Sequence, residues 1–374
     1  YEPVRLFMEE SGHEHWGLTV WLINFQGGFV RRGWPGEVIY QAWQSMGLSP
    51  RMAVIVISYA LLAIMLISAW RQLRRLYPPE ILLSSALFGT PLLAHTLLQK
   101  DILVIVFFMM GLAICRHTRS APLAFALAAL VIVVAVLSHE TFLFFGAPAL
   151  ILAFGLRQYQ AGLPLLRALL SLWPLVVATM GATALASHFK GSPEIAQAVH
   201  DSWLPLWQQI GGAGCCTEPA ASFRALGWSL RQGIEQQAIV LDDFSFFIYV
   251  PAAWVLTAVV LFFLAVKTAR IETRAERLGL AGIFLLQFAA VAPMVVLGLD
   301  FGRWLFAWMA TSALLVAHIQ TAFPGLMGRF YPGNGTVPSQ TWRIHPAFLL
   351  IFAVPATQWS VYAYLQATPL GGIA

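Results

Sequence analysis

Three short groups of ionisable residues interrupt an otherwise apolar chain. They are Lys100–Asp101, His139–Glu140 and Asp300 with Arg303. Ionisable side chains at membrane depth are costly to desolvate and usually have a function. A histidine beside a carboxylate is typical of general acid–base chemistry, and a guanidinium is typical of anion binding. These residue types together indicate a site that binds an anion and moves a proton.

The rest of the chain is a series of apolar segments. Hydrophobic residues make up 59% of the sequence and charged residues 10%, which excludes an ordinary soluble domain. Since a span needs roughly 20 mainly apolar residues, the sequence predicts an all-α polytopic bundle of about ten transmembrane helices. The expected spans are 52–69, 81–99, 101–115, 122–138, 141–156, 164–187, 246–266, 280–298, 304–322 and 347–365.

Basic residues are concentrated in alternate connections between these spans. The connections are 71–75, 116–119, 157–167, 267–277 and 329–343. The positive-inside rule places them in the cytoplasm, so the three charged groups face the outside. The expected location is the inner membrane of a bacterium, with the functional face in the periplasm. The same asymmetry accounts for the net charge of +5, which therefore does not indicate nucleic-acid binding.

Two regions outside the spans also fall on the outer face. They define a division into an N-terminal segment, 1–50, and a transmembrane bundle, 51–374, which contains the outer loop region 188–245. Both regions are rich in tryptophan, which predicts amphipathic helices at the membrane interface. Translocation of residues 1–50 requires a further element, either a signal sequence that is removed or one more transmembrane helix upstream of Tyr1, and the helix is the favoured expectation.

The first two charged pairs occupy the tips of predicted helical hairpins, 81–115 and 122–156. An arm of about fifteen residues reaches only about 22 Å, whereas the hydrocarbon layer is roughly 30 Å thick. We therefore expect both tips to lie below the outer membrane surface, in a water-filled cavity.

A proton acceptor is predicted at the second tip. Glu140, or His139 polarised by it, would deprotonate an acceptor hydroxyl once burial raises the pKa of the carboxylate. Asp101 and Asp300 are the other candidates for this role. The structural alternative is that Ser138 caps the returning helix and Glu140 stabilises its first turn.

Four cationic residues form the predicted binding set for a lipid phosphate. They are Arg31, Arg32, Lys100 and Arg303. The two adjacent arginines lie in a Gly-rich turn, 27–36, whose backbone N–H groups can approach a phosphate. A solvated interfacial turn is the alternative, and Lys100 could equally extend its ammonium to the membrane surface while Asp101 caps a helix.

Arg303 lies at the start of the expected span 304–322, where the helix dipole disfavours a cation. A bound anion would account for this placement. The alternative is a local ion pair, in which Asp300 caps the helix and pairs with Arg303.

Metal and cysteine motifs are sparse. His13-Glu14-His15 lacks the spacing that places two imidazoles on one helical face, so no metal site is predicted and a divalent cation remains open. Cys215 and Cys216 could form an adjacent disulfide or remain two thiols.

A phosphate-binding cation set, a base and an outward-facing membrane cavity suit glycosyl transfer from a polyprenyl-phosphate-linked sugar. The donor is anchored in the bilayer, so the cations would hold its phosphate at the interface. The expected partners are therefore this lipid-linked donor, a glycan acceptor and the bilayer.

Four short motifs carry a family resemblance. They are Phe29-Val30-Arg31-Arg32-Gly33, Lys100-Asp101, Ser138-His139-Glu140 and Asp300-Phe301-Gly302-Arg303-Trp304. With the hydropathy pattern, they resemble bacterial polytopic polysaccharide polymerases and GT-C-like glycosyltransferases. The resemblance implies an enzyme that assembles cell-surface polysaccharide from undecaprenyl-linked glycans. Two other functions stay open, namely a membrane O-acyltransferase that modifies a surface glycan and a non-catalytic subunit of a polysaccharide export complex.

Overall fold

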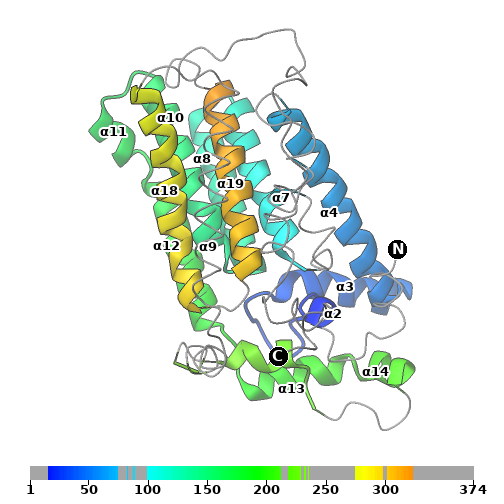
Figure 1. Ribbon diagram of the computed structural model, residues 1–374. Coiled ribbons are helices and arrows are strands. Elements are labelled where there is room, and N and C mark those ends of the chain that lie inside the picture. The colour runs from blue at the N-terminus through cyan, green and yellow to red at the C-terminus, as the bar shows by residue number, and fades with distance from the viewer. Residues whose placement is uncertain are drawn as a thin grey trace, which may run out of the picture.

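A computed structural model describes residues 16–74, 82, 87–88, 99–211, 218–228, 231–232, 235, 274–297 and 301–322. Every regular element within these ranges is a helix, so the all-α prediction is confirmed for this part of the chain. Long helices run side by side along one axis, and shorter helices gather at one end of them (Figure 1).

The long bundle is formed by nine described helices. They are α4 (Pro50–Leu73), α7 (Asp101–His117), α8 (Ala121–Ser138), α9 (Phe142–Phe145), α10 (Ala147–Gln160), α11 (Leu165–Leu170), α12 (Trp173–His188), α18 (Arg274–Leu297) and α19 (Phe301–Ala322). The shorter elements are α2 (Trp16–Thr19), α3 (Gly33–Met46), α13 (Pro193–Ser202), α14 (Leu204–Gly211), α15 (Ala221–Arg224) and the 3-10 helix η1 (Ala225–Gly227).

Four helical segments among the described residues are long and apolar enough to cross a membrane. They are Pro50–Leu73, Ala121–Ser138, Phe142–Gln160 and Leu165–His188. Their length and composition indicate a membrane protein. They coincide with four of the expected spans, whereas the expected spans 246–266 and 347–365, and nearly all of 81–99, lie outside the described residues.

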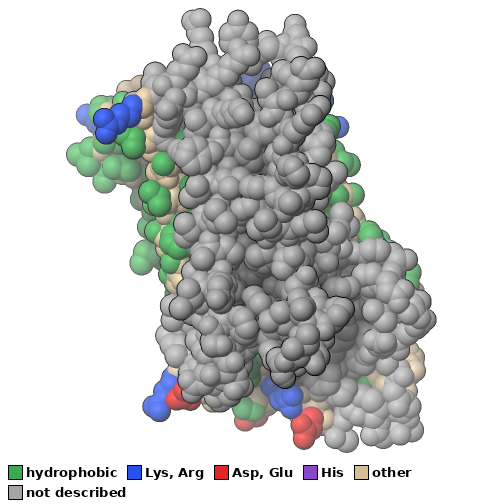
Figure 2. Space-filling view, viewed as in Figure 1, with side chains coloured by type: hydrophobic (Ala, Val, Ile, Leu, Met, Phe, Trp, Pro, Cys, Tyr) green, Lys and Arg blue, Asp and Glu red, His purple; other side chains and the backbone are tan. Residues whose placement is uncertain are grey.

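The outward faces of two of these segments are strongly apolar. Figure 2 shows hydrophobic side chains along the left edge of the view, where α11 and α12 lie in Figure 1. Large exposed side chains there include Leu165, Leu166, Leu169, Leu170, Trp173, Val177 and Met180. Helix α4 exposes a similar set on its outer face, namely Met52, Val56, Tyr59, Ile64, Ile67 and Trp70. Contiguous apolar surface of this extent is expected where a helix faces lipid.

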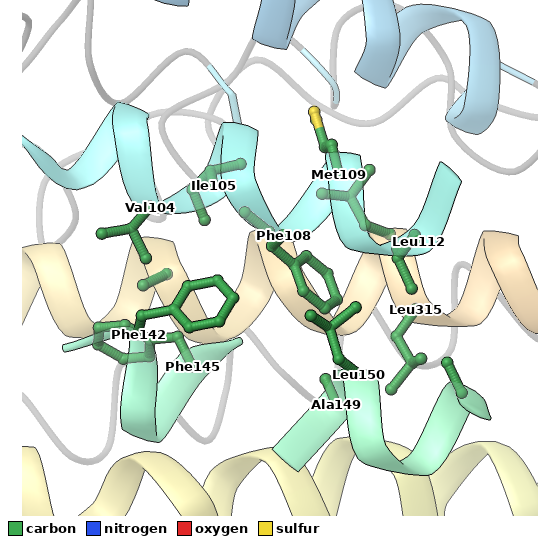
Figure 3. Packing of buried hydrophobic residues seen from close by; sticks show 14 of the residues in the cluster. Val104, Ile105, Phe108, Met109, Leu112, Phe142, Phe145, Ala149, Leu150 and Leu315 are labelled. Atoms are coloured by element: carbon green, nitrogen blue, oxygen red, sulfur yellow. The ribbon is translucent and has the colours of Figure 1, made fainter. Parts of the chain in front are cut away.

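The interior of the bundle is a continuous hydrophobic core around α19. Every residue of α19 from Phe306 to Gln320 is buried, so this helix has no solvent-facing side over that length. Phe108 from α7 packs beside Leu150 from α10 (Figure 3). A Cβ atom at Gly111 would lie 2.6 Å from Leu150 Cδ1, so the absence of a side chain there permits the close approach of α7 and α10.

A second hydrophobic cluster joins the two outer regions to each other. Trp203, which follows α13, is fully buried and its indole N–H donates to the carbonyl oxygen of Leu22 at 2.7 Å. The ring of Trp203 also stacks on that of Trp43 in α3, with centroids 5.2 Å apart. The prediction that the 188–245 region presents its tryptophans to the membrane interface is therefore wrong for Trp203 and Trp207, which lie inside this cluster. Trp228 fits the expectation better, because 42% of its surface is exposed.

Polar contacts identify the two ends of the bundle. At one end, Arg157 donates to the carbonyl oxygens of Cys115 and Thr118 at 3.0 and 2.7 Å, and Arg116 donates to Thr321 Oγ1 at 3.3 Å. The other end carries the short helices and the start of α7, the α8–α9 connection and the start of α19. The expected placement of the charged groups at a common end is thus confirmed for the described residues.

Which end faces the outside can be tested by cysteine labelling. In a background with Cys215 and Cys216 replaced by serine, Gln197→Cys and Glu218→Cys should react with a membrane-impermeant maleimide in intact cells. Arg74→Cys and Arg119→Cys should react only after the cells are opened, because positive-inside asymmetry places them in the cytoplasm. All four positions are exposed. Labelling of either cytoplasmic position in intact cells would contradict the orientation.

Candidate functional site

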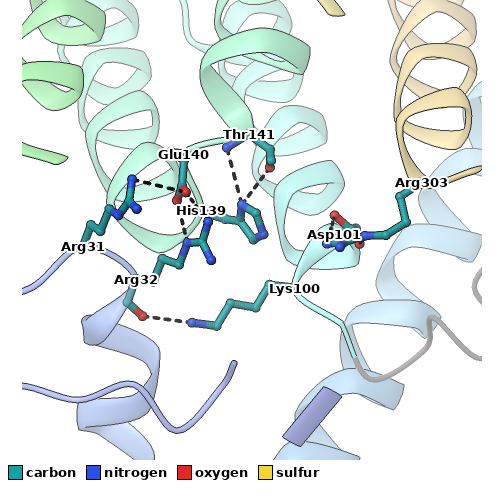
Figure 4. A network of polar contacts seen from close by, with 8 residues as sticks. All are labelled: Arg31, Arg32, Lys100, Asp101, His139, Glu140, Thr141 and Arg303. Carbon is teal, nitrogen blue, oxygen red and sulfur yellow. Dashed lines mark hydrogen bonds and ion pairs between the residues drawn. The ribbon is translucent and has the colours of Figure 1, made fainter. Parts of the chain in front are cut away.

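Four separate segments bring together all the predicted site residues except Asp300, which lies outside the described residues. The segments are the turn before α3, the start of α7, the α8–α9 connection and the start of α19 (Figure 4). They contribute Arg31, Arg32, Lys100, Asp101, His139, Glu140 and Arg303. Thr141 is a further member that the sequence did not indicate.

The turn before α3 is held in place by its backbone. Arg31 N–H donates to the carbonyl oxygen of Phe189, just after α12, and Arg32 N–H donates to that of Leu137 in α8, both at 2.8 Å. Arg32 has a left-handed backbone with φ 66°, the only positive φ at a non-glycine residue in the described chain. Such a conformation costs roughly 1–2 kcal/mol, so the surrounding contacts must hold it. Residues in this state often lie at functional sites.

Arg32 and Arg31 converge on one carboxylate. Arg32 Nε donates to Glu140 Oε2 at 2.7 Å, and its Nη2 pairs with Glu140 Oε1, which gives a bidentate contact. Arg31 Nη1 lies 3.6 Å from Glu140 Oε1. Between 17 and 23% of each of these three side chains is exposed, so this half of the network reaches the surface.

The two guanidinium groups reverse the direction in which the pKa of Glu140 was expected to shift. Burial by itself would raise the pKa of this carboxyl, as the sequence argument assumed. Arg32 and Arg31 outweigh burial and hold the pKa of Glu140 well below its usual range. The expectation of a raised pKa is therefore wrong. At neutral pH Glu140 stays ionised, and its low basicity makes it a poor proton acceptor.

The second ion pair is buried and links two helices. Arg303 Nη2 donates to Asp101 Oδ1 at 2.8 Å, and its Nε pairs with Oδ2. Only 6 and 7% of the two side chains are exposed. Arg303 lies in the first turn of α19, as predicted, but the anion that compensates it is a carboxylate from α7. The alternative of a local pair with Asp300 lies outside the described residues.

Lys100 holds the turn before α3 in place and does not reach the membrane surface. Its side chain is completely buried, Nζ donates to the carbonyl oxygen of Arg32 at 2.9 Å, and it lies 5.7 Å from the ring centre of Trp21. Burial, and then the charge of Arg32, hold the pKa of Lys100 well below its usual range. The alternative of an ammonium extended to the surface is wrong. Asp101 is also no side-chain cap, because Lys100 occupies the N-cap position of α7 and no side-chain cap bond forms there.

His139 lies between the two ion pairs (Figure 4). Its Nδ1 accepts a long hydrogen bond of 3.4 Å from Thr141 N–H and lies 2.9 Å from Thr141 Oγ1. Burial, followed by the charge of Arg32, lowers the pKa of His139 to about 3, so the ring is neutral at physiological pH. With Nδ1 accepting, the proton belongs on Nε2. This tautomer makes His139 a hydrogen-bond donor on its other side rather than a base.

Ser138 does not cap the returning helix. Its hydroxyl donates to the carbonyl oxygen of Val134 within α8 and accepts from the indole N–H of Trp34. The α8–α9 connection is thus fastened to α3 through Trp34. No sequence pattern pointed to Trp34, because its partner lies 104 residues away.

The donor set at this site suits an anion rather than a metal. Among the described residues, no group of three or more His, Cys, Asp and Glu side chains is placed to hold a metal ion. Instead three guanidinium groups pair with two carboxylates, and Lys100 donates to the carbonyl oxygen of Arg32.

No protein-family model, curated protein or solved structure matches the chain. What the fold and the site define is an all-helical protein with apolar helices long enough to span a membrane and a charged network at one end of its bundle. The resemblance to polysaccharide polymerases and GT-C-like enzymes stays a prediction from the sequence.

Proposed function

We propose that this protein transfers a sugar from a polyprenyl-phosphate-linked donor to a glycan acceptor at the periplasmic face of a bacterial inner membrane. The observation that carries the proposal is the sharing of Glu140 by Arg31 and Arg32. Two guanidinium charges against one carboxylate leave one positive charge in excess, and this excess lies at the exposed edge of the network.

Arg31 is the residue best suited to hold the donor phosphate. Its contact with Glu140 is loose at 3.6 Å, and within the described residues its buried Nε has no hydrogen-bond partner. A phosphate could accept two parallel hydrogen bonds from this guanidinium. Arg32 would add charge while staying fixed to Glu140. The sequence placed Lys100 and Arg303 in the same phosphate-binding set. Lys100 instead supports the turn that carries Arg31, and Arg303 supports the helix packing.

The chemistry follows from where charge develops. The bond between the anomeric carbon and the phosphate oxygen breaks, and the acceptor oxygen bonds to that carbon. The negative charge that appears on the departing polyprenyl phosphate is stabilised by Arg31. The acceptor proton must pass to a base.

The base in this proposal is Asp300. Of the predicted acid–base residues, Glu140 is held ionised by two arginines, Asp101 is paired with Arg303, and His139 accepts at Nδ1. Asp300 directly precedes α19 in the chain, two residues from Gly302 and three from Arg303. The sequence therefore assigns a carboxylate to the same end of the bundle.

Arg31→Gln tests the phosphate-binding role. Loss of a charge-assisted pair costs about 1.5–3 kcal/mol, so affinity of the purified protein for undecaprenyl phosphate should fall about 10–150-fold. The measurement is calorimetric titration in detergent micelles. Arg119→Gln, an exposed arginine at the opposite end of the bundle, is the matched control and should bind as the unaltered protein does. Equal affinity of both variants would refute the assignment of Arg31.

A further inference from the structure

A row of aromatic rings runs from the turn before α3 to the end of α12. The rings of Phe25 and Phe29 are stacked with their centres 5.1 Å apart, and Phe29 meets Phe189 edge to face at 4.9 Å. His188 continues the row, because its ring centre lies 4.7 Å from that of Phe189. Phe29 keeps 43% of its surface exposed although it packs on two other rings, so the row has an open side.

The row is continuous with the exposed face of α12. Val177, Met180 and Leu185 expose 57, 67 and 43% of their surface on this helix. Leu185 lies one turn before Phe189, whose backbone N–H donates to the Leu185 carbonyl oxygen at 2.9 Å. Side chains three or four residues apart share one side of a helix, and no ionisable residue occurs in the stretch 173–187. An apolar surface therefore leads along α12 to the aromatic row.

Arg31 lies at the point where this surface ends. Its backbone N–H donates to the carbonyl oxygen of Phe189 at 2.8 Å, so the turn before α3 is attached to the end of α12. The residue proposed to bind the donor phosphate is thus next to the end of a lipid-facing helix, at the end of the bundle that carries the short helices (Figure 1). A lipid held by its phosphate at Arg31 would have the first part of its chain against the aromatic row.

The occupant of this surface must combine an apolar chain with an anion. An aliphatic chain packs on aromatic faces through many weak dispersion contacts, and the excess positive charge of Arg31 and Arg32 favours a phosphate beside them. The rings form a single row, which suits the one chain of a polyprenyl phosphate, whereas a bilayer phospholipid brings two acyl chains. The surface thus fits the lipid part of the proposed donor.

We propose that the isoprenoid chain of the donor lies along α12 and passes over Phe189 and Phe29, so that its phosphate reaches Arg31 from the side of the bilayer. This inference rests on the proposed function, because it assigns the chain of the donor whose phosphate Arg31 binds. The aromatic row then fixes the direction from which the donor enters the site.

The test compares two probes that carry the same phosphate but different chains. Undecaprenyl phosphate and geranyl phosphate are titrated into the purified protein by calorimetry at one detergent concentration. Undecaprenyl phosphate should bind at least about tenfold more tightly, because its longer chain covers more apolar surface. Neither probe contains a sugar, so an effect of Phe29 on their binding reports contact with the chain.

Two exposed apolar residues are replaced in turn, and thermal unfolding checks that each variant is folded. Phe29→Ala should weaken binding of both probes by about fivefold or more, since its ring belongs to the turn that carries Arg31 and contacts the first part of either chain. Met180 precedes Phe189 by about 13 Å along the helix, so Met180→Ala should weaken binding of undecaprenyl phosphate alone. Trp70→Ala is the matched control and should bind both probes normally, because Trp70 is 42% exposed but lies on α4.

Unchanged affinity of Phe29→Ala for undecaprenyl phosphate would overturn the proposal. Equal displacement of undecaprenyl phosphate by dioleoyl phosphatidic acid would also overturn it, because the surface would then accept any lipid with a phosphate. Arg31→Gln, measured in the same way, separates this inference from the proposed function. If Arg31→Gln loses affinity and Phe29→Ala does not, only the chain site fails. If Phe29→Ala loses affinity and Arg31→Gln does not, the chain contact stands and the assignment of the phosphate to Arg31 fails.

Discussion

Asp101→Asn is expected to destabilise the folded protein by about 3–5 kcal/mol, because it breaks a buried ion pair by removing one partner. The substitution preserves shape but replaces the carboxylate that pairs with the Arg303 guanidinium, which is only 6% exposed, by a neutral amide. The contact joins α7 to α19, which is buried on every side from Phe306 to Gln320, so its loss should loosen the centre of the bundle. Thermal unfolding of the purified protein in detergent measures the effect.

The control for this prediction is an ion pair at the surface. Glu218→Gln removes the partner of Arg224, but 76% of the glutamate side chain is exposed. Exposed pairs contribute about 0–1 kcal/mol, so this variant should unfold almost as the unaltered protein does. If Asp101→Asn were equally harmless, the Asp101–Arg303 pair would not hold α7 and α19 together.

The location of the site was predictable because it depends on the order of the spans. Consecutive spans cross the membrane in opposite directions, so the span ends near residues 100, 139 and 301 must fall on one side. It can therefore be predicted that the charged groups lie together, without any knowledge of how the helices pack. The unusual position of Arg303 was predictable for a similar reason, since the helix dipole acts within the first turn of any helix.

Pairing within the site was not predictable, since it depends on which helices touch. The guanidinium of Arg303 binds Asp101, which is 202 residues away, and no spacing in the sequence connects the two. The prediction of a raised pKa for Glu140 was wrong for the same reason. Burial acts in a known direction, but the net shift depends on how many cations approach the carboxylate, and Arg31 and Arg32 come from another segment.

The outer helices show a second limit of sequence patterns. An apolar stripe on α13 or α14 indicates that one face is covered, but it does not identify the covering surface. The membrane was the natural expectation for Trp203 and Trp207. The covering surface is instead the N-terminal segment around Leu22 and Trp43, whose own pattern predicts an independent interfacial region.

Asp300→Asn should lower the rate of sugar transfer by about 10²–10⁴-fold, the usual contribution of a general base. The substitution keeps size and hydrogen bonding but removes basicity. Transfer is measured with purified protein, a polyprenyl-phosphate-linked donor and a soluble glycan acceptor. Binding of undecaprenyl phosphate should be unaffected, which separates loss of the base from loss of the phosphate site.

Glu140→Gln is the decisive comparison, because the sequence alone made Glu140 the base. The carboxyl of Glu140 has a pKa held well below its usual range, so it remains ionised as pH falls towards that lowered value and accepts a proton poorly near neutrality. Glutamine can still accept hydrogen bonds from Arg32, and the donor phosphate supplies the missing negative charge. The rate should therefore fall by less than about tenfold, well short of the effect of removing a base.

If Glu140→Gln instead abolished transfer while Asp300→Asn remained active, Glu140 would be the base despite its arginine partners. The donor phosphate would then have to draw Arg31 and Arg32 away from the carboxylate and raise its basicity in the bound complex.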